Sequence, residues 1–438
     1  MLKAKNRMGL VFFPAYDWAI SPTHPEREER LLYTQDQVLE EGLLDIDGIT
    51  EYKPDIASIE DVERVHICVP DVKSRITDSH LISAGGAIAC GDAFMKGEVD
   101  KAFALVRPPG HHARRIVHGA RGFCNINIEA VMIEKLRKKY GIRKVAIVDT
   151  DCHHGDGTQD IYWHDSETLF ISIHQDGRTL YPGTGFPSEL GGPNAVGYTL
   201  NVPLPPRTSD KGFLYVIDNL VNPVLKEFQP DLIINSAGQD NHYSDPITNM
   251  NFSAQGYAEL NHRLNPDIAV LEGGYSIEDA LPYVNTGIIL AMAGLDYSMV
   301  KEPDFTPERF KQPKETDEYI KRLCEHLYNK WNKRDIIRKE LIKDKKYVKQ
   351  DRYVYYDTDG ISEEQREITK VCDECSGLSV VESRSDRGYH VTAVIIPRNA
   401  CPRCYEEGLE EYEKKLKNGN QMVFLQDKKN DVFYNNRG

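Results

Sequence analysis

The segment KVAIVDTDCHHGDG, residues 144–157, places a short aliphatic run directly before three carboxylates and two imidazoles. The end of a buried strand cannot hold so many ionisable groups unless they are paired or bind a cation. At a strand terminus residues i and i+2 point the same way, so Asp151 and His153 can present an oxygen and a nitrogen to one ion. The segment therefore predicts a metal site at the end of a core strand.

A second carboxylate, Asp240, ends another apolar run in the sequence SAGQD. Two aspartates and one histidine leave a tetrahedral zinc ion with one open position for water, which is typical of a catalytic site. An isolated Asp-x-His is more often a surface turn or a helix cap. Five titratable groups within eight residues favour the metal instead.

Other short aliphatic runs alternate with helical stretches along the first 300 residues, which is the pattern of βαβ units around a buried parallel sheet. The predicted strands are Leu10–Phe13, Ala102–Val106, Lys144–Val148, Leu169–Ile173, Thr199–Val202, Leu232–Asn235 and Ile268–Leu271, and the clearest helices are Ser83–Lys96, Ile128–Lys139 and Phe213–Phe228. We expect a three-layer α/β fold with polar loops gathered at the carboxyl ends of the strands.

One of these loops, RPPGHHA, carries the adjacent histidines His111 and His112. Two carboxylates nearly cancel the charge of a zinc ion, so a general base is expected nearby, and a histidine needs a partner to set its tautomer. Asp149 and Asp156 are available for that role. Cys152 lies beside Asp151, faces away from the metal by strand alternation, and is expected to pack in the core.

Taken together, the motifs RPPGHHA, GFCN, VDTDCHHGDGT, SIHQ, YPGTG, AGQDNHYSDP and LEGGY resemble the histone deacetylase family, which includes acetylpolyamine amidohydrolases and acetoin-utilisation proteins. The resemblance covers about residues 8–297 and begins with HPEREER at residues 24–30. It implies an arginase/deacetylase-like fold with a central parallel sheet.

The resemblance also implies roles for individual residues. Asp151, His153 and Asp240 match the family's zinc ligands, His112 matches the general base paired with Asp156, and His111 matches an electrostatic partner paired with Asp149. Tyr275 matches the tyrosine that polarises the substrate carbonyl, Phe123 and Tyr181 match the aromatic walls of a narrow acyl-lysine tunnel, and the carbonyl of Gly122 matches the acceptor for the substrate amide. A monovalent cation site, for K⁺, would fall on Asp149, Asp151, His153, Ser172 and Ile173.

The expected function is a zinc-dependent deacetylase that acts on acylated lysine in a peptide or protein, or on an acetylated polyamine. An arginase-like ureohydrolase would need a two-metal cluster with additional aspartates. A non-catalytic scaffold of the same fold would bind acyl-lysine or cationic ligands without turnover. The residues do not choose between protein, polyamine and other N-acyl substrates.

The charge distribution favours cationic substrates for the first part of the chain. Residues 1–300 carry a net charge of −15 and residues 301–438 a net charge of +1. An acidic body attracts amines and disfavours nucleic acid, although the same balance also serves solubility. The apolar run at residues 10–13 is too short for a signal or a membrane span, and nine cysteines without an export signal favour a reducing cytoplasm.

The remainder of the chain contains two CxxC pairs, Cys372 with Cys375 and Cys401 with Cys404. Two such pairs make a closed Cys₄ zinc site, and the β-prone runs around Asp386-Arg387-Gly388 indicate a small β zinc ribbon. We expect the bound metal to replace a core that this segment is too short to build, and the role to be structural or protein-binding. The predicted units are a catalytic domain (1–300), a solvated, charged helical linker (301–362) and the zinc-ribbon module (363–438).

Overall fold

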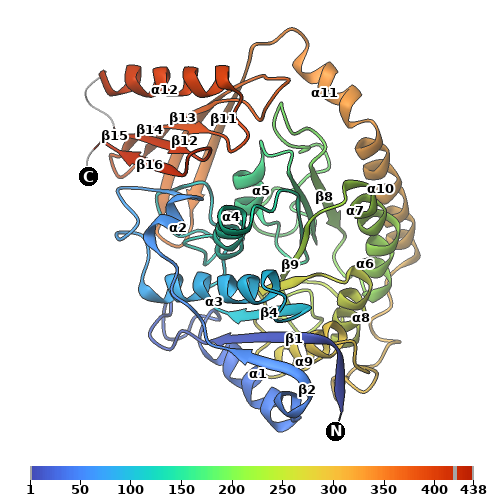
Figure 1. Cartoon of the computed structure of the whole chain (residues 1–438). Coiled ribbons are helices and arrows are strands. Elements are labelled where there is room, and N and C mark those ends of the chain that lie inside the picture. Colours follow the sequence, from blue (N-terminus) through green and yellow to red (C-terminus); the bar gives the residue numbers. More distant parts are fainter. Residues whose placement is uncertain (1, 418–421, 437–438) are drawn as a thin grey trace.

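The computed structural model describes residues 2–417 and 422–436, so residues 418–421 and 437–438 of the predicted module lie outside the described residues, as does Met1. Two sheets organise the chain (Figure 1). The larger is an eight-stranded sheet in the order β2-β1-β4-β10-β9-β6-β7-β8. Its strands are β1 (Lys3–Phe13), β2 (Asp47–Tyr52), β4 (Lys101–Val106), β6 (Val145–Asp149), β7 (Thr168–Gln175), β8 (Thr199–Leu204), β9 (Leu232–Ala237) and β10 (Ile268–Leu271).

Every pairing in this sheet is parallel, as the alternation of strands and helices predicted. Alternate side chains of the inner strands enter two separate cores, which is why these strands read as nearly continuous apolar runs. On β4, Phe103 and Leu105 belong to one core and Ala104 to the other. The sheet is therefore the middle layer of a three-layer α/β fold.

Helices cover both faces of the sheet. One core contains apolar residues of α1 (Glu29–Glu40), α6 (Asp210–Val216), α7 (Asn222–Phe228), α8 (Ala254–Leu264) and α9 (Leu281–Met292), and the other contains those of α2 (Ile59–Glu63), α3 (Asp78–Met95), α4 (Ile128–Tyr140) and α5 (Asp156–Tyr162). The predicted helix over residues 213–228 is two helices joined by a π-helical turn, Ile217–Val221. A short 3-10 turn (Leu43–Asp45) and a two-stranded pair, β3 (Ile67–Cys68) with β5 (Ile116–Val117), complete this part.

The segment expected to be a solvated linker is helical only in part. Helix α10 (Lys314–Asn332) buries Leu327 and Trp331 in the core that also contains residues of α1 and α9. Helix α11 (Arg334–Ile342) has no buried residue. The reason is the spacing of Ile320, Leu323, Leu327 and Trp331, which forms one apolar stripe on an otherwise charged helix. Strand β11 (Tyr347–Tyr356) then begins within the range assigned to the linker.

The second sheet has six strands in the order β11-β12-β13-β14-β15-β16. The remaining members are β12 (Ile361–Lys370), β13 (Ser379–Ser385), β14 (His390–Ile396), β15 (Met422–Asp427) and β16 (Val432–Asn435), with helix α12 (Pro402–Lys417) between β14 and β15. The hairpin predicted around Asp386-Arg387-Gly388 is present as β13 and β14. The sheet lies against the domain built on the eight-stranded sheet, beside α2 and α4 (Figure 1).

The expectation that only a metal holds this segment together is wrong. Val381, Val391 and Ile395 of the second sheet share a core with Ile67 of β3 and Ile116 of β5. In a second cluster, Tyr405 and Leu409 of α12 pack against the apolar residues of β14, among them Val394 and Ile396. The expectation failed because it counted only the residues between the two CxxC pairs, whereas the apolar residues come from the whole sheet and from the body it covers.

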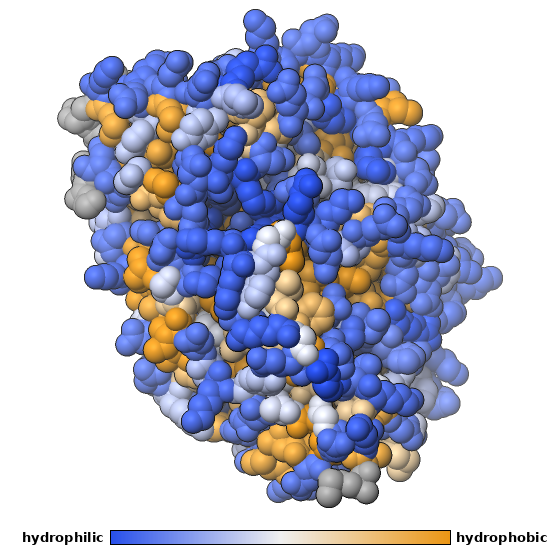
Figure 2. All heavy atoms as spheres, viewed as in Figure 1, coloured by the Kyte–Doolittle hydropathy of each residue, from blue (hydrophilic) through white to orange (hydrophobic). Residues whose placement is uncertain are grey.

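The surface in the view of Figure 2 is mostly hydrophilic, and hydrophobic residues appear there as separate patches. Within the described ranges, no helix combines the length and the apolar character needed to cross a membrane.

Candidate metal centre and active site

The site is assembled at the carboxyl ends of four neighbouring strands. His111 and His112 follow β4, Tyr275 follows β10 and Asp240 follows β9. Asp149 is the last residue of β6, and the loop with Asp151 and His153 follows it. Because the four strands are adjacent and parallel, their loops meet at one edge of the sheet. The structure thus brings together residues that are up to 164 positions apart, His111 and Tyr275.

The proposed metal ligands form a compact buried group. One ligand atom each from Asp151, His153 and Asp240 lies within 4.8 Å of the others, and Nδ1 of His153 is 2.7 Å from Oδ2 of Asp240. Burial disfavours the charged imidazole of His153, but Asp240 and Asp151 outweigh it and raise its pKa to about 10. Two carboxylates concentrated around one imidazole are a set that fits a divalent cation, and nitrogen with oxygen ligands suits zinc.

Backbone groups hold the two carboxylates in place. Oδ2 of Asp151 accepts a hydrogen bond of 2.7 Å from the backbone N–H of Gly273, and Oδ1 of Asp240 accepts one of 2.7 Å from Cys152. A Cβ atom at Gly238 would lie 2.1 Å from Oδ2 of Asp151, so only glycine fits there. Such supporting bonds orient metal ligands and are part of a working metal site. Cys152 is fully buried in the core that contains residues of α1 and α9.

Both predicted histidine–aspartate pairs are present. Nδ1 of His112 is 2.8 Å from Oδ1 of Asp156, and Nδ1 of His111 is 3.1 Å from Oδ2 of Asp149. Burial lowers the pKa of His112 to about 3, and the neighbouring His111 acts in the same direction. For His111 burial is outweighed by Asp151 and Asp149, which raise its pKa well above the usual value. The pair thus combines a neutral imidazole with a cationic one.

The neutral His112 has one free ring nitrogen. Its Nδ1 is engaged by Asp156, and Nε2 forms no hydrogen bond within the part of the chain that the structure describes. Burial raises the pKa of Asp156, but Arg121 and His112 hold it well below its usual range, so this carboxylate stays ionised. His112 is therefore oriented to accept or release a proton at Nε2.

Tyr275 is buried, and its ring packs edge-on against Phe123 at 5.8 Å. Burial raises the pKa of its phenol well above 10, so the hydroxyl stays protonated and can donate a hydrogen bond. Asp245 accepts a bond of 2.8 Å from its backbone N–H, and Arg30 lies 5.0 Å from the centre of its ring.

The aromatic ring of Tyr181 lies 5.1 Å from that of His112 and 6.3 Å from that of His153. Gly122 and Phe123 both adopt left-handed backbone angles, with φ of 52° and 70°. For a bulky residue such as Phe123 this conformation is rare and costs free energy, and it is found most often at functional sites.

The residues of the expected monovalent cation site lie on adjacent strands. Asp149 of β6 is the register partner of Ser172 of β7, and Oγ of Ser172 is 2.9 Å from Nδ1 of His174. Ile173 is fully buried on the same strand.

Sequence reasoning missed several residues that support this site. Glu272, in the LEGGY motif, accepts backbone hydrogen bonds from Gly110 (2.7 Å) and His111 (3.0 Å) and so holds the histidine loop. Arg121, directly before the GFCN motif, pairs with Asp156 at 2.9 Å. Both residues lie within or beside a motif, and that position could have identified them from the sequence. Asp357, which contacts Gly122 and Tyr181, carried no signal because it belongs to the second sheet.

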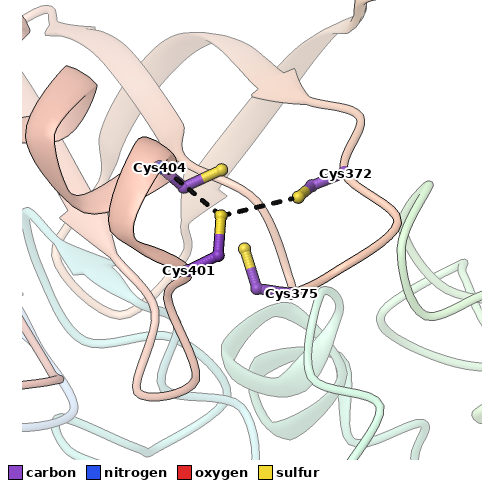
Figure 3. A group of neighbouring side chains, drawn as sticks. All are labelled: Cys372, Cys375, Cys401 and Cys404. Carbon is purple, nitrogen blue, oxygen red and sulfur yellow. Dashed lines mark hydrogen bonds between the residues drawn. The ribbon is translucent and has the colours of Figure 1, made fainter.

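The four cysteines of the second sheet form a separate cluster (Figure 3). Their sulfur atoms lie within 4.8 Å of one another, and those of Cys372 and Cys401 are 3.9 Å apart, far longer than a disulfide. Backbone N–H groups of Glu374 and Gly377 point at the sulfurs of Cys372 and Cys375. Burial opposes the thiolate of Cys372, yet hydrogen bonds from the backbone of Glu374 and from Cys375 lower its pKa to about 7. Four buried sulfurs at this spacing fit a closed structural zinc site.

Comparison with known proteins agrees with this geometry. The family model of the histone deacetylase domain matches residues 70–292. A protein of Archaeoglobus fulgidus named as a probable deacetylase is 46% identical over 329 residues, which cover 68% of this chain and 90% of that protein. An acetylpolyamine amidohydrolase of Burkholderia pseudomallei is 38% identical over 201 residues, covering 45% of this chain and 57% of that protein.

Among solved structures, the HD domain of HDA15 superimposes with a TM-score of 0.65 at 25% identity, over 77% of this chain and 98% of that one. The chain therefore belongs to the histone deacetylase family, and its class is that of the deacetylase-type hydrolases.

Proposed function

We propose that this protein is a zinc-dependent amidohydrolase that cleaves the amide of N-acyl lysine side chains or of related N-acetylated amines such as acetylpolyamines. The observation that carries the proposal is the juxtaposition of a buried Asp-His-Asp group with a neutral His112 and a protonated Tyr275. A zinc ion held by Asp151, His153 and Asp240 would supply Lewis-acid polarisation of the amide carbonyl and activation of water.

The residues of the chain divide the remaining work. Nε2 of His112 takes the proton of the attacking water and then passes it to the leaving amine, while Asp156 keeps the proton of Nδ1 in place. The Tyr275 hydroxyl donates a hydrogen bond to the carbonyl oxygen as negative charge develops there. His111, paired with Asp149, adds positive charge beside the site.

Substrate alignment falls to the residues around Tyr181. Phe123 and Tyr181 flank the acyl-bearing chain, and the Gly122 carbonyl accepts the amide N–H. We assign K⁺ to the position of Asp149, Asp151, His153, Ser172 and Ile173, and a second zinc ion to Cys372, Cys375, Cys401 and Cys404. The cytoplasm is the proposed compartment. Residues 1–300 form the proposed catalytic unit, and residues 363–438 carry the cysteine module, which has a structural or protein-binding role.

Acetate release from N-acetylputrescine and from an acetyl-lysine peptide, measured with zinc-loaded protein, tests the function. Tyr275→Phe should lower kcat roughly 10²-fold while zinc content stays unchanged, as expected when one oxyanion donor is lost. Tyr297→Phe is the matched control, because the Tyr297 hydroxyl donates to Glu259, which is not one of the proposed site residues. An unchanged kcat in Tyr275→Phe contradicts the role of Tyr275. Wild-type protein that contains zinc yet hydrolyses no acyl amine would favour the non-catalytic scaffold, and two catalytic manganese ions would favour a ureohydrolase.

A further inference from the structure

The turn between β11 and β12 of the second sheet reaches the residues that flank the proposed substrate path. Oδ1 of Asp357, in this turn, accepts a hydrogen bond of 2.9 Å from the Tyr181 hydroxyl and one of 3.2 Å from the backbone N–H of Gly122. Tyr181 and Gly122 come from separate loops of the catalytic body. One carboxylate of the second sheet thus connects two walls of the site.

The position of Asp357 is fixed by a series of bonds between the second sheet and the loop that leads to Gly122. The hydroxyl of Tyr356 donates to the carbonyl of Ile116 at 2.8 Å, and the backbone N–H of Ala120 donates to Oδ2 of Asp359 at 2.7 Å. Nη1 of Arg121 donates to the carbonyl of Tyr355 at 2.5 Å. The turn is therefore a constituent of the site wall rather than a loosely attached flap.

Asp357 has no ion-pair partner among the residues that the structure describes. The guanidinium of Arg121, which lies 5.4 Å from the centre of the Tyr181 ring, is paired with Asp156 instead. The carboxylate is half-buried, and the hydrogen bonds that it accepts from the described residues all come from neutral donors. A half-buried negative charge with only neutral donors can gain further stabilisation from a cation that arrives with a ligand.

We propose that Asp357 determines substrate specificity by binding a free ammonium group of the acylated amine as it lies against Tyr181 and Gly122. This assignment rests on the proposed function and narrows it to substrates that carry a second, cationic nitrogen. The net charge of −15 on residues 1–300 acts in the same direction, because it raises the local concentration of amines.

The chemistry of the two substrate classes explains the choice. In N-acetylputrescine, four methylenes separate the scissile amide from an ammonium group, whereas in acetyl-lysine the same four methylenes lead to the neutral peptide backbone. Tyr181 extends from the proposed general base to Asp357, since its ring lies beside His112 and its hydroxyl donates to Asp357. A carboxylate at the far end of that ring favours the ammonium over the neutral chain.

The test compares kcat/KM for N-acetylputrescine and for its neutral analogue N-(4-hydroxybutyl)acetamide in wild type and Asp357→Asn. Asparagine retains an oxygen for Tyr181 and Gly122 and removes only the charge. The preference for the cationic substrate should fall about fivefold, as for a partly exposed ion pair, and the wild-type preference should weaken with added salt. Asp386→Asn is the control, because Asp386 accepts a backbone N–H in the same sheet but contacts no wall residue.

An unchanged preference in Asp357→Asn, or an equal loss for both substrates, overturns the assignment. Ligand binding separates this failure from failure of the proposed function, because binding requires no turnover. Calorimetry with 6-aminohexanehydroxamic acid and hexanehydroxamic acid measures the same charge difference at the same chain length on zinc-loaded protein. If wild type releases no acetate but Asp357→Asn loses the preference for the amino compound about fivefold, the ammonium site stands and the hydrolytic function falls.

Discussion

Replacing Gly122 with alanine should disable the site without removing any reactive group. Gly122 has a φ of 52°, and a Cβ atom added there would lie 2.3 Å from Cδ2 and 2.8 Å from Cγ of His112. It would also lie 3.0 Å from Cε1 of Tyr181. The new methyl group thus meets the imidazole that we assign as the general base.

Two separate costs follow from this geometry. An alanine in the left-handed region costs about 1–2 kcal/mol relative to its preferred conformations. Because ordinary contacts of a Cβ atom begin near 3.4 Å, the His112 ring or the loop must move by about 1 Å, and a misplacement of that size can lower kcat about 100-fold. Zinc content should not change, since none of the three ligands touches the new atom among the contacts found for it.

Turnover, thermal unfolding and metal content should be measured on Gly122→Ala beside Gly141→Ala. Gly141 caps the carboxyl end of α4 with a φ of 71° and has nothing within 4 Å of an added Cβ, so its variant carries the backbone cost alone. Its variant should lose about 1–2 kcal/mol of stability with activity within twofold of wild type. If Gly122→Ala is as active as Gly141→Ala, the placement of His112 against Gly122 is not what catalysis requires.

Two further perturbations address the cysteine cluster and a buried histidine. Cys372→Ser combined with Cys401→Ser should reduce zinc from two ions per chain to one, because four sulfurs within 4.8 Å cannot lose two ligands and hold the metal; an unchanged zinc count by elemental analysis would exclude the Cys₄ site. Burial lowers the pKa of His66 to about 4. Between pH 6.5 and pH 4 the unfolded chain therefore binds a proton at His66 and the folded protein does not, so the free energy of unfolding falls as the pH drops. Between pH 7 and pH 5 wild type should lose about 2 kcal/mol more than His66→Gln in denaturant titrations, and equal losses would contradict this role of His66.

Much of the catalytic fold could be predicted from the sequence because its strands are buried on both faces. Runs such as 102–106 and 232–235 contain few polar residues, and each is followed by a polar loop, so both the sheet and its functional edge were predictable. Strand β2 was missed, because its sequence DGITEY has only one buried residue, Ile49, and lies at the edge of the sheet.

The chemistry-bearing residues were also predictable, because they are concentrated in short motifs directly after strands. What could not be predicted was their support from distant parts of the chain. Asp357 lies 176 positions from Tyr181 and in another sheet, and nothing in its own neighbourhood indicates that it meets the site. The packing of the second sheet against the first domain was likewise not predicted. Alternate residues of β12 are polar but buried, so the sequence pattern alone suggested that they face solvent.

The charged residues between the two sheets have a consequence for how such a protein can change over generations. Arg115 and Arg352 share Glu367, while Arg114 and Arg352 share Asp160, with separations of 2.8–3.0 Å, and Arg114 continues to Asp156 at 3.3 Å. An unmatched charge buried at such a boundary is strongly destabilising. Losing the second sheet would therefore take Glu367 from the buried Arg115, which has no other ion pair among the described residues, and would take Arg352 from Asp160. The second sheet is therefore not a detachable module. A related protein that lacks it would also need substitutions among the charged residues that face it in the first domain.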